Sequence, residues 1–262
     1  MGRPGLGLAA ESALSHVSDV VSATGHALPW TVGLMTVDPP DARRLDDPDT
    51  VDAALARASQ RWPDVSATTC ATLWWYGSSS TLALVVASQL LVTGKCIDPG
   101  ASVSTVSIGG TGTLEAVTSS SVVDAVDAPD ALADVVDFVV RTLCARVPGL
   151  SAPSLWAVAS DSAANRTLDA ASALGRIGDA SPLIASLTSR PRAQRFPEPR
   201  LVDVTRDGSV TPANDGPPAA GTRRFLRRSS CCLVFEAGES MCTSCPRRTP
   251  ADRAHRWSAL VG

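Results

Sequence analysis

Four of the seven cysteines lie within fifteen residues of one another near the end of the chain. Cys231 and Cys232 are adjacent, and nine residues separate them from the motif Cys242-Thr-Ser-Cys245. Two thiolates with two residues between them can reach one metal ion, because the backbone turns back toward the sulfurs. Adjacent cysteines point to opposite faces of an extended chain, so Cys231 and Cys232 need a local turn to serve one site.

The spacing of these cysteines distinguishes two kinds of metal site. A zinc site with four cysteines is usually assembled from two pairs, each with two to four residues between its members, and this chain supplies one such pair. A [2Fe-2S] cluster also takes four thiolates, but it presents two irons, so the ligands need not converge on one point. The spacing therefore favours a [2Fe-2S] cluster held by Cys231, Cys232, Cys242 and Cys245, with a four-cysteine zinc module as the alternative.

The cysteine segment also resembles a known family. The run Arg227-Arg-Ser-Ser-Cys-Cys-Leu-Val-Phe235, a glycine-containing loop and then Cys242-x-x-Cys-Pro246 are similar to the C-terminal [2Fe-2S] segment of the FhuF-like ferric siderophore reductases. The spacer of nine residues is one shorter than in that family. A second, less specific match is Ser154 to Arg166, which resembles the helix that those proteins carry between body and cluster segment.

The resemblance implies a cytoplasmic enzyme that transfers one electron to siderophore-bound Fe(III) and releases Fe(II). Reduction weakens chelation by hydroxamate or catecholate oxygens, because Fe(II) has the lower charge density. No catalytic residue beyond the cluster ligands is expected. The implied partners are a ferric siderophore and an electron donor of the ferredoxin or flavin reductase type, without nucleic acid. Two other functions stay open: a zinc module that binds nucleic acid or protein, and a [2Fe-2S] electron carrier or sensor.

Charge is unevenly distributed along the chain. The net charge is −3, yet residues 221–256 hold eight arginines against Glu236, Glu239 and Asp252, so this segment carries +5 and the rest carries −8. Arginines beside the cysteines could raise the cluster potential, attract an anionic chelate or an acidic donor, or hold the segment on the acidic body by ion pairs. The flanking arginines are Arg223, Arg224, Arg227, Arg228, Arg247 and Arg248.

The composition is that of a globular protein with an ordinary core: 262 residues, 44% hydrophobic and 19% charged. The N-terminus has no charged region followed by a long apolar run, so no secretory signal is expected, and grouped metal-type cysteines suit a reducing cytoplasm. No P-loop, dinucleotide motif, Ser-His-Asp order or His-Glu-x-x-His motif occurs, which leaves nucleotide and hydrolytic chemistry without support. The remaining cysteines, expected to be core residues, are Cys70, Cys96 and Cys144.

The apolar pattern predicts an α+β fold, with a mainly helical body and a small antiparallel sheet followed by a C-terminal iron-sulfur segment. We expect the body in residues 1–190, a Pro/Gly-rich linker in 191–220 and the [2Fe-2S]-binding segment in 221–262. Helices are expected where apolar residues recur at helical spacing and caps or prolines mark the ends. The predicted helical residues are 8–24, 50–62, 67–92, 129–147, 153–174 and 182–189.

Three further expectations concern the body. Residues 67–92 are apolar but interrupted by Gly77 and Ser78 to Ser80, which predicts a pair of buried helices rather than a membrane span and leaves peripheral membrane contact open. The turn at Gly109–Gly112 predicts a hairpin between strands 102–108 and 113–118, and residues 200–205 form a short strand. Trp74, Trp75 and Tyr76 are expected to pack in the core, with a wall of a substrate pocket as the alternative.

Overall fold

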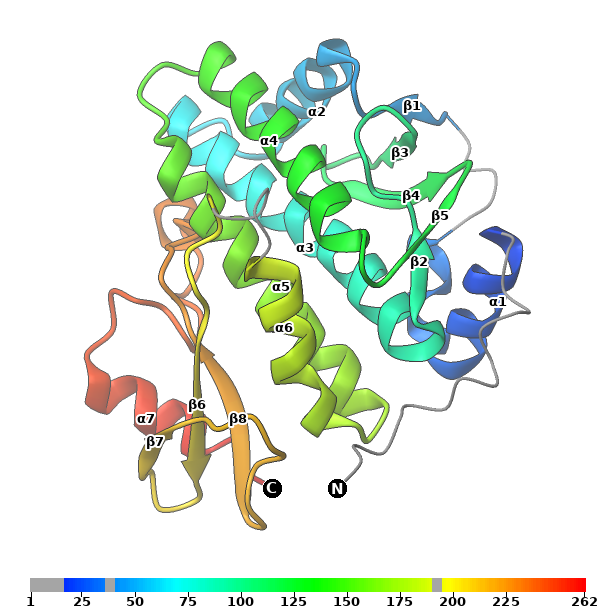
Figure 1. The fold of residues 1–262 in the computed structure, drawn as a ribbon. Helices are drawn as coiled ribbons and strands as arrows, with labels where there is room; N and C mark the ends of the chain where they lie inside the picture. The colour runs from blue at the N-terminus through cyan, green and yellow to red at the C-terminus, as the bar shows by residue number, and fades with distance from the viewer. Residues whose placement is uncertain (1–16, 36–40, 190–194) are drawn as a thin grey trace.

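A helical body makes up most of the molecule, and a smaller β layer with one helix lies at its C-terminal end (Figure 1). The computed structural model describes residues 17–35, 41–189 and 195–262. Helix α3 (Ala67–Thr93) runs through the middle of the body and packs most extensively against α5 (Ala152–Ala173). The helices packed around this pair are α1 (Val17–Ala27), α2 (Pro48–Arg61), α4 (Ala128–Arg146) and α6 (Ala180–Ser189).

Helix α3 is one continuous helix, so the prediction of a helix pair is wrong. It begins after Ser66, whose hydroxyl accepts the Thr69 N–H, and it ends at Gly94 in the left-handed conformation. The interior residues that suggested a break serve close packing instead. Ser79 shares a 2.8 Å hydrogen bond with Ser162 of α5, and a Cβ on Gly77 would lie only 3.0 Å from a Thr113 methyl carbon. Tertiary contacts therefore override the weak local preference of these residues.

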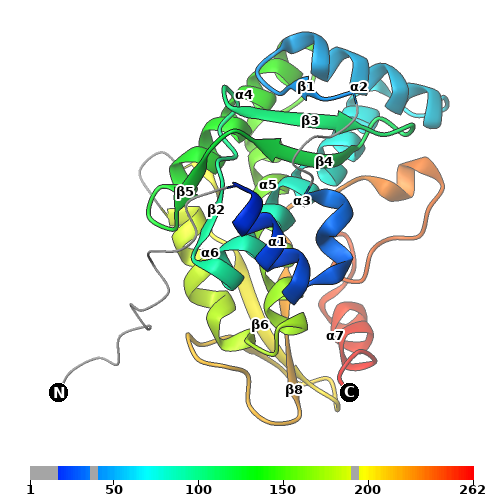
Figure 2. The same cartoon turned by 90° about the vertical axis from the view of Figure 1, so that its right-hand side faces the viewer.

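Among the described residues, α3 is the one helix with the length and composition to cross a membrane. Two-thirds of its most apolar window, 67%, is buried inside the fold. Figure 2 shows the other elements of the body around it. This burial is what the sequence predicted for an internal helix.

The other predicted helices are confirmed with ends shifted by one or two residues. The exception is the first, whose expected start lies outside the described residues. Asp47 caps α2 by accepting the Asp49 N–H. Pro48 occupies the first helical turn, where its missing N–H costs nothing.

Within the described residues, three small antiparallel sheets occur where one was predicted. The expected hairpin is confirmed as β3 (Ser104–Ile108) and β4 (Leu114–Ser119), joined at the edge by β1 (Arg43–Arg44). The other two sheets are β2 (Lys95–Ile97) with β5 (Val122–Asp124), and β7 (Val210–Pro212), β6 (Arg200–Thr205) and β8 (Thr222–Arg227) in that order. Strands of two or three residues carry too little alternation to be detected, and β8 is hidden among arginines. The strand predicted at residues 200–205 is β6.

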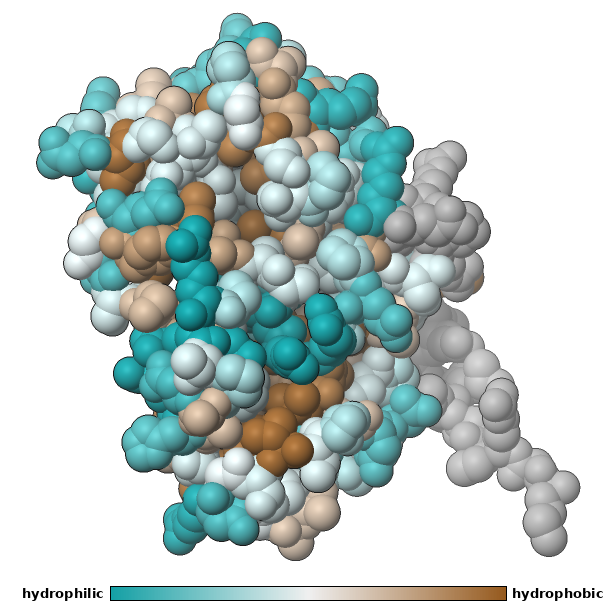
Figure 3. Space-filling view, turned by 90° about the vertical axis from the view of Figure 1, so that its left-hand side faces the viewer, coloured by the Kyte–Doolittle hydropathy of each residue, from teal (hydrophilic) through white to brown (hydrophobic). Residues whose placement is uncertain are grey.

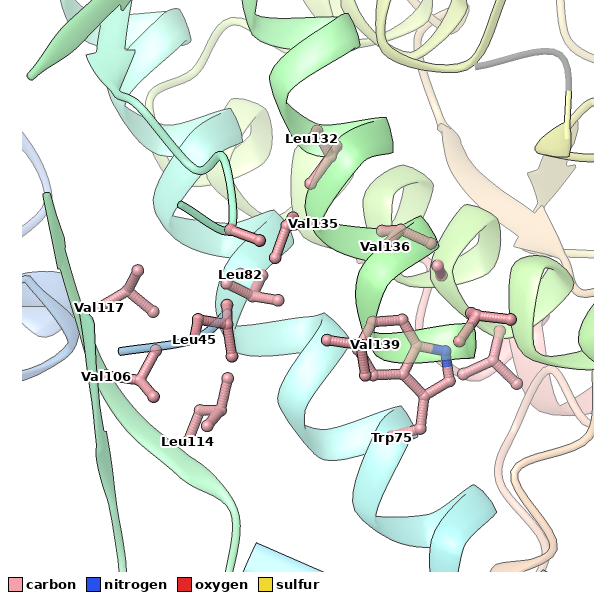
Figure 4. Close-up of a cluster of buried hydrophobic side chains, with 14 of the residues drawn as sticks. Leu45, Trp75, Leu82, Val106, Leu114, Val117, Leu132, Val135, Val136 and Val139 are labelled. Atoms are coloured by element: carbon pink, nitrogen blue, oxygen red, sulfur yellow. The ribbon is translucent and has the colours of Figure 1, made fainter. Parts of the chain in front are cut away.

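One hydrophobic core joins α3, α4 and the first sheet. Figure 4 shows Leu82 of α3 between Val135 of α4 and the sheet side chains, with Trp75 on the other side of α3 beside Val139. Trp74 and Trp75 are 1% and 0% exposed, which confirms their core role. Their indole N–H groups donate to the carbonyls of Gly112 and Leu155 at 2.7 and 2.9 Å. Both buried polar groups are therefore satisfied.

Gly112 closes the β3–β4 turn against α2. Its φ is +84°, and a Cβ there would lie 2.3 Å from the Ala54 carbonyl oxygen. We expect Gly112→Ala to lower the free energy of unfolding by about 2 kcal/mol or more, measured by urea denaturation, because backbone strain and a clash add. Gly110→Ala in the same turn is the control, since its Cβ would meet open space. Equal losses in both variants would contradict the packing argument.

The third sheet and α7 (Pro250–Ser258) hold the C-terminal end of the chain together. Trp257 of α7 stacks on Phe225 of β8 with ring centroids 5.7 Å apart, and Val202 and Val204 of β6 pack beneath them. The residues predicted as a linker, 191–220, contain β6 and β7. The cysteine segment is thus the connection between β8 and α7, both of which are fixed to the same small core.

Candidate metal centre

The four cysteines lie on one loop that leaves β8 and returns to α7. Cys231 and Cys232 follow soon after β8, and Leu233 then adopts the left-handed conformation with φ of +62°. A short 3-10 helix, η4 (Val234–Ala237), follows at once. This is the local turn that adjacent cysteines require. At the second motif the Cys245 N–H donates to the Cys242 carbonyl at 3.1 Å, which turns the backbone between these cysteines.

The four thiols form two pairs, each with one member from either motif. Cys232 interacts by a hydrogen bond with Cys242, and Cys231 does so with Cys245. The bond between the first two sulfurs lowers the pKa of Cys232 to about 5 and raises that of Cys242, because one proton is shared between them. Burial raises the pKa of Cys231.

The loop supplies the four thiols that an iron-sulfur cluster requires. Across residues 17–35, 41–189 and 195–262, no three His, Cys, Asp or Glu side chains are grouped so that they could hold one ion. A [2Fe-2S] cluster takes four thiolates, and this loop carries four cysteines. All seven cysteines are free of disulfides, so none of these sulfurs is withheld from a ligand role.

Asp161 of α5 fixes the residues that precede the first cysteine pair. Its carboxylate is 1% exposed and accepts the backbone N–H groups of Ser229 and Ser230 at 3.2 and 2.8 Å, together with both serine hydroxyls. A buried carboxylate is tolerated only with such partners. Sequence reasoning assigned Asp161 no role. The signal that could have found it is a single acidic residue in the run 156–164 of α5, whose other members are Trp, Val, Ala and Ser.

Arg228 connects Asp161 to the cluster segment. Its guanidinium lies 3.5 Å from the Asp161 carboxylate, donates to the Cys242 sulfur at 3.5 Å and covers the Tyr76 ring at 4.7 Å. The side chain is 2% exposed. Arg228 therefore both holds the segment on the body and puts a positive charge beside a cysteine sulfur. Tyr76 supports this arginine at the edge of the metal centre, while its two tryptophan neighbours lie in the core.

The other flanking arginines divide into structural and exposed groups. Arg224 pairs with Asp203 at 2.8 Å, and Arg248 donates to the Cys242 carbonyl at 3.0 Å. Arg253, which sequence reasoning did not single out, is buried and donates to the Arg248 carbonyl. Arg224 thus stabilises the third sheet, and Arg248 and Arg253 bind backbone carbonyls of the cysteine loop. The exposed arginines around the segment are Arg223, Arg227 and Arg247.

Two contacts fix the rest of the loop. The Thr69 hydroxyl in the first turn of α3 donates to Glu236 of η4 at 2.5 Å, which ties the spacer between the motifs to the body. The Trp257 indole N–H donates to the Ser244 hydroxyl at 3.0 Å, which ties the second motif to α7. The cysteine loop is thus held from both sides.

The remaining cysteines lie apart from this loop. Cys70 and Cys96 are buried in the core as predicted, and burial raises the pKa of Cys96. Cys144 is half-buried on α4 and packs at the core's edge.

A pocket of about 510 Å³ opens beside Cys231. It is bordered by the first turns of α3 and α5 and by the loop around the first cysteine pair. Two other pockets, of about 480 and 400 Å³, include none of the four cysteines in their lining. The face that carries the loop is at the left of Figure 1, and Figure 3 shows hydrophobic patches on it separated by a hydrophilic band.

The fold and the loop together define a helical protein with a C-terminal iron-sulfur domain. Residues 228–247 match the family model of the FhuF 2Fe-2S C-terminal domain. This range contains all four cysteines of the loop, so the predicted resemblance is confirmed for this segment, and its cofactor is a [2Fe-2S] cluster. No curated protein matches the chain.

Proposed function

We propose that the protein is a cytoplasmic reductase of siderophore-bound Fe(III). Its ligands to the [2Fe-2S] cluster are Cys231, Cys232, Cys242 and Cys245. The observation that carries this proposal is the FhuF-type match on the loop that bears all four cysteines, with Cys231 half-buried beside an open pocket. A bound [2Fe-2S] cluster supplies one-electron transfer. One electron from a reduced ferredoxin or flavin protein then converts one chelated Fe(III) to Fe(II), which oxygen ligands hold less tightly.

The cytoplasmic location is supported by the chemistry of the cysteines. All seven are free thiols, which persist in a reducing compartment. Fractionation of cells that express the tagged chain tests this part of the proposal. The tagged protein is expected in the soluble cytoplasmic fraction, and recovery from membranes or from outside the cell would contradict it.

The reductase activity can be tested with protein purified without oxygen. We expect about two irons and two sulfides per chain, with bleaching and a spin-half EPR signal after reduction with dithionite. Excess dithionite is removed, and the reduced protein is mixed with a ferric chelate and a colorimetric Fe(II) trap. One trapped Fe(II) per reduced protein is the expected result. A reduced protein that ferric chelates leave unchanged, but that another redox protein reoxidises, would favour an electron carrier instead.

The positive charge of Arg228 is expected to raise the reduction potential. Replacing Arg228 by Gln should lower the potential by on the order of 50 mV, or about 1 kcal/mol for one electron, because a cation no longer offsets the negative charge gained on reduction. An EPR-monitored redox titration measures the shift. Arg227→Gln is the matched control, since Arg227 is adjacent but exposed. Equal potentials in both variants would mean that Arg228 only holds the segment in place.

A further inference from the structure

The pocket beside Cys231 is a small-molecule site without an assigned ligand. We infer that it is the docking site for the ferric chelate, and that it takes a chelate whose surface carries no net charge. This inference rests on the proposed function. This chelate pocket is lined by residues of α3, of the start of α5 and of the cysteine loop. They are Thr68, Thr72, residues 149–151, 153–155, 157 and 158, and Ser229, Ser230, Cys231 and Leu233.

The position of the chelate pocket suits electron transfer. Rates of electron transfer fall steeply with distance, so the acceptor iron must approach a ligand sulfur or the atoms next to it. The lining includes Cys231, which is half-buried, the preceding Ser230, and Leu233, which follows Cys232. The volume of about 510 Å³ is in the range of sites for small molecules. A chelate in this pocket would therefore contact the cluster segment directly.

The floor and the rim of the chelate pocket differ in character. Leu155 and Val158 of α5, each 1% exposed, form an apolar floor. The rim carries the hydroxyls of Ser151 and Ser154, at the start of α5, while the Ser229 hydroxyl in the lining donates to Asp161. The Ser151 hydroxyl does not cap α5, so it accepts no hydrogen bond from the backbone N–H groups of the first turn. The rim can donate hydrogen bonds to the oxygens of a chelate.

Apart from Cys231, a proposed thiolate ligand of the cluster, the lining carries no formal charge. None of its 14 residues is Arg, Lys, His, Asp or Glu. Placing a highly charged chelate against an uncharged, partly apolar wall costs desolvation energy that no counter-ion returns. The exposed arginines Arg223 and Arg247 lie outside the lining, so they do not supply that counter-ion. Uncharged chelates with acceptor oxygens are therefore the class that the pocket fits.

Blocking the chelate pocket with one bulky residue tests its role. Ser154→Trp places an indole on the exposed rim of the pocket. Ser172→Trp is the matched control: it is the same substitution on the same helix, also exposed, and it lines the pocket of about 480 Å³ at the far end of α5. Both variants are made in the full chain with its cluster, and the visible spectrum and iron content are expected to match those of the unmodified protein.

Binding is measured first, without any redox step. The probe is tris(maltolato)gallium(III), a neutral six-oxygen chelate of a metal that the protein cannot reduce, in isothermal titration calorimetry. We expect the unmodified protein and Ser172→Trp to bind it equally, and Ser154→Trp to bind at least tenfold more weakly. A hexadentate gallium tricatecholate of charge −3 should bind the unmodified protein at least tenfold more weakly than the neutral chelate. Equal or tighter binding of the anionic chelate would overturn the charge assignment.

Electron transfer is measured second, with tris(maltolato)iron(III) as oxidant of the dithionite-reduced proteins. The recovery of visible absorption should be at least tenfold slower in Ser154→Trp than in Ser172→Trp, while ferricyanide reoxidises both at the same rate. Equal binding and equal rates in the two variants would overturn the docking site, as would a loss confined to Ser172→Trp. Should the unmodified protein bind the gallium chelate in the pocket but reduce no ferric chelate, the proposed function fails and the binding site stands.

Discussion

Replacement of Cys232 by serine is expected to remove the cluster and leave the helical body folded. Cys232 is 2% exposed and pairs with Cys242, so its loss deprives one thiol pair of a member at a place where no other cysteine can substitute. A serine hydroxyl is a harder and less readily ionised ligand than a thiolate. Bound iron and sulfide should fall at least about tenfold from the level of about two each per chain. Iron and sulfide assays on protein purified without oxygen measure the loss.

The matched control for this prediction is Cys144→Ser. Cys144 is half-buried on α4 and belongs to the core's edge, so the same substitution there should leave iron and sulfide unchanged. Far-ultraviolet circular dichroism of both variants should match that of the unmodified protein, because the core of α3, α4 and α5 does not include Cys232. Full iron and sulfide in Cys232→Ser would remove this residue from the ligand set.

Asp161→Asn is expected to have the largest effect on stability. The substitution keeps the size of the side chain but removes the charge that faces Arg228, whose side chain is 2% exposed. It also turns one acceptor into an amide that cannot accept from Ser229 and Ser230 together as the carboxylate does. Breaking one half of a buried ion pair costs about 3 to 5 kcal/mol. Urea denaturation of the full chain with its cluster measures the free energy, and iron content shows whether the loop still holds the cluster.

Asp169→Asn on the same helix is the control for this second prediction. Asp169 pairs with Arg166 at 2.9 Å, but its side chain is 49% exposed, so losing this pair should cost under about 1 kcal/mol. Iron content should not change in the control. Similar losses of stability in the two variants would show that the buried network of Asp161 and Arg228 is not what fixes the cysteine loop.

The sequence by itself determined the features that depend on near neighbours. The nine-residue spacer and the two residues between Cys242 and Cys245 indicated an iron-sulfur segment, because the reach of a thiolate is set by local backbone geometry. Helices α2, α4 and α5 followed from apolar periodicity with prolines and caps at their ends, and the β3–β4 hairpin followed from its glycine turn. Each of these signals lies within a few residues of the structure it predicts.

Only the tertiary structure decided the features that join distant parts of the chain. Asp161 and Ser230 are 69 residues apart, and Thr69 and Glu236 are 167 apart, yet these contacts fix the cysteine loop on the body. The pairing of the thiols, the support of Arg228 by Tyr76 and the pocket beside Cys231 also require the folded chain. The physical reason is that burying a charge or a hydroxyl is favourable only when its partner is brought to it, and local propensity carries no information about that partner.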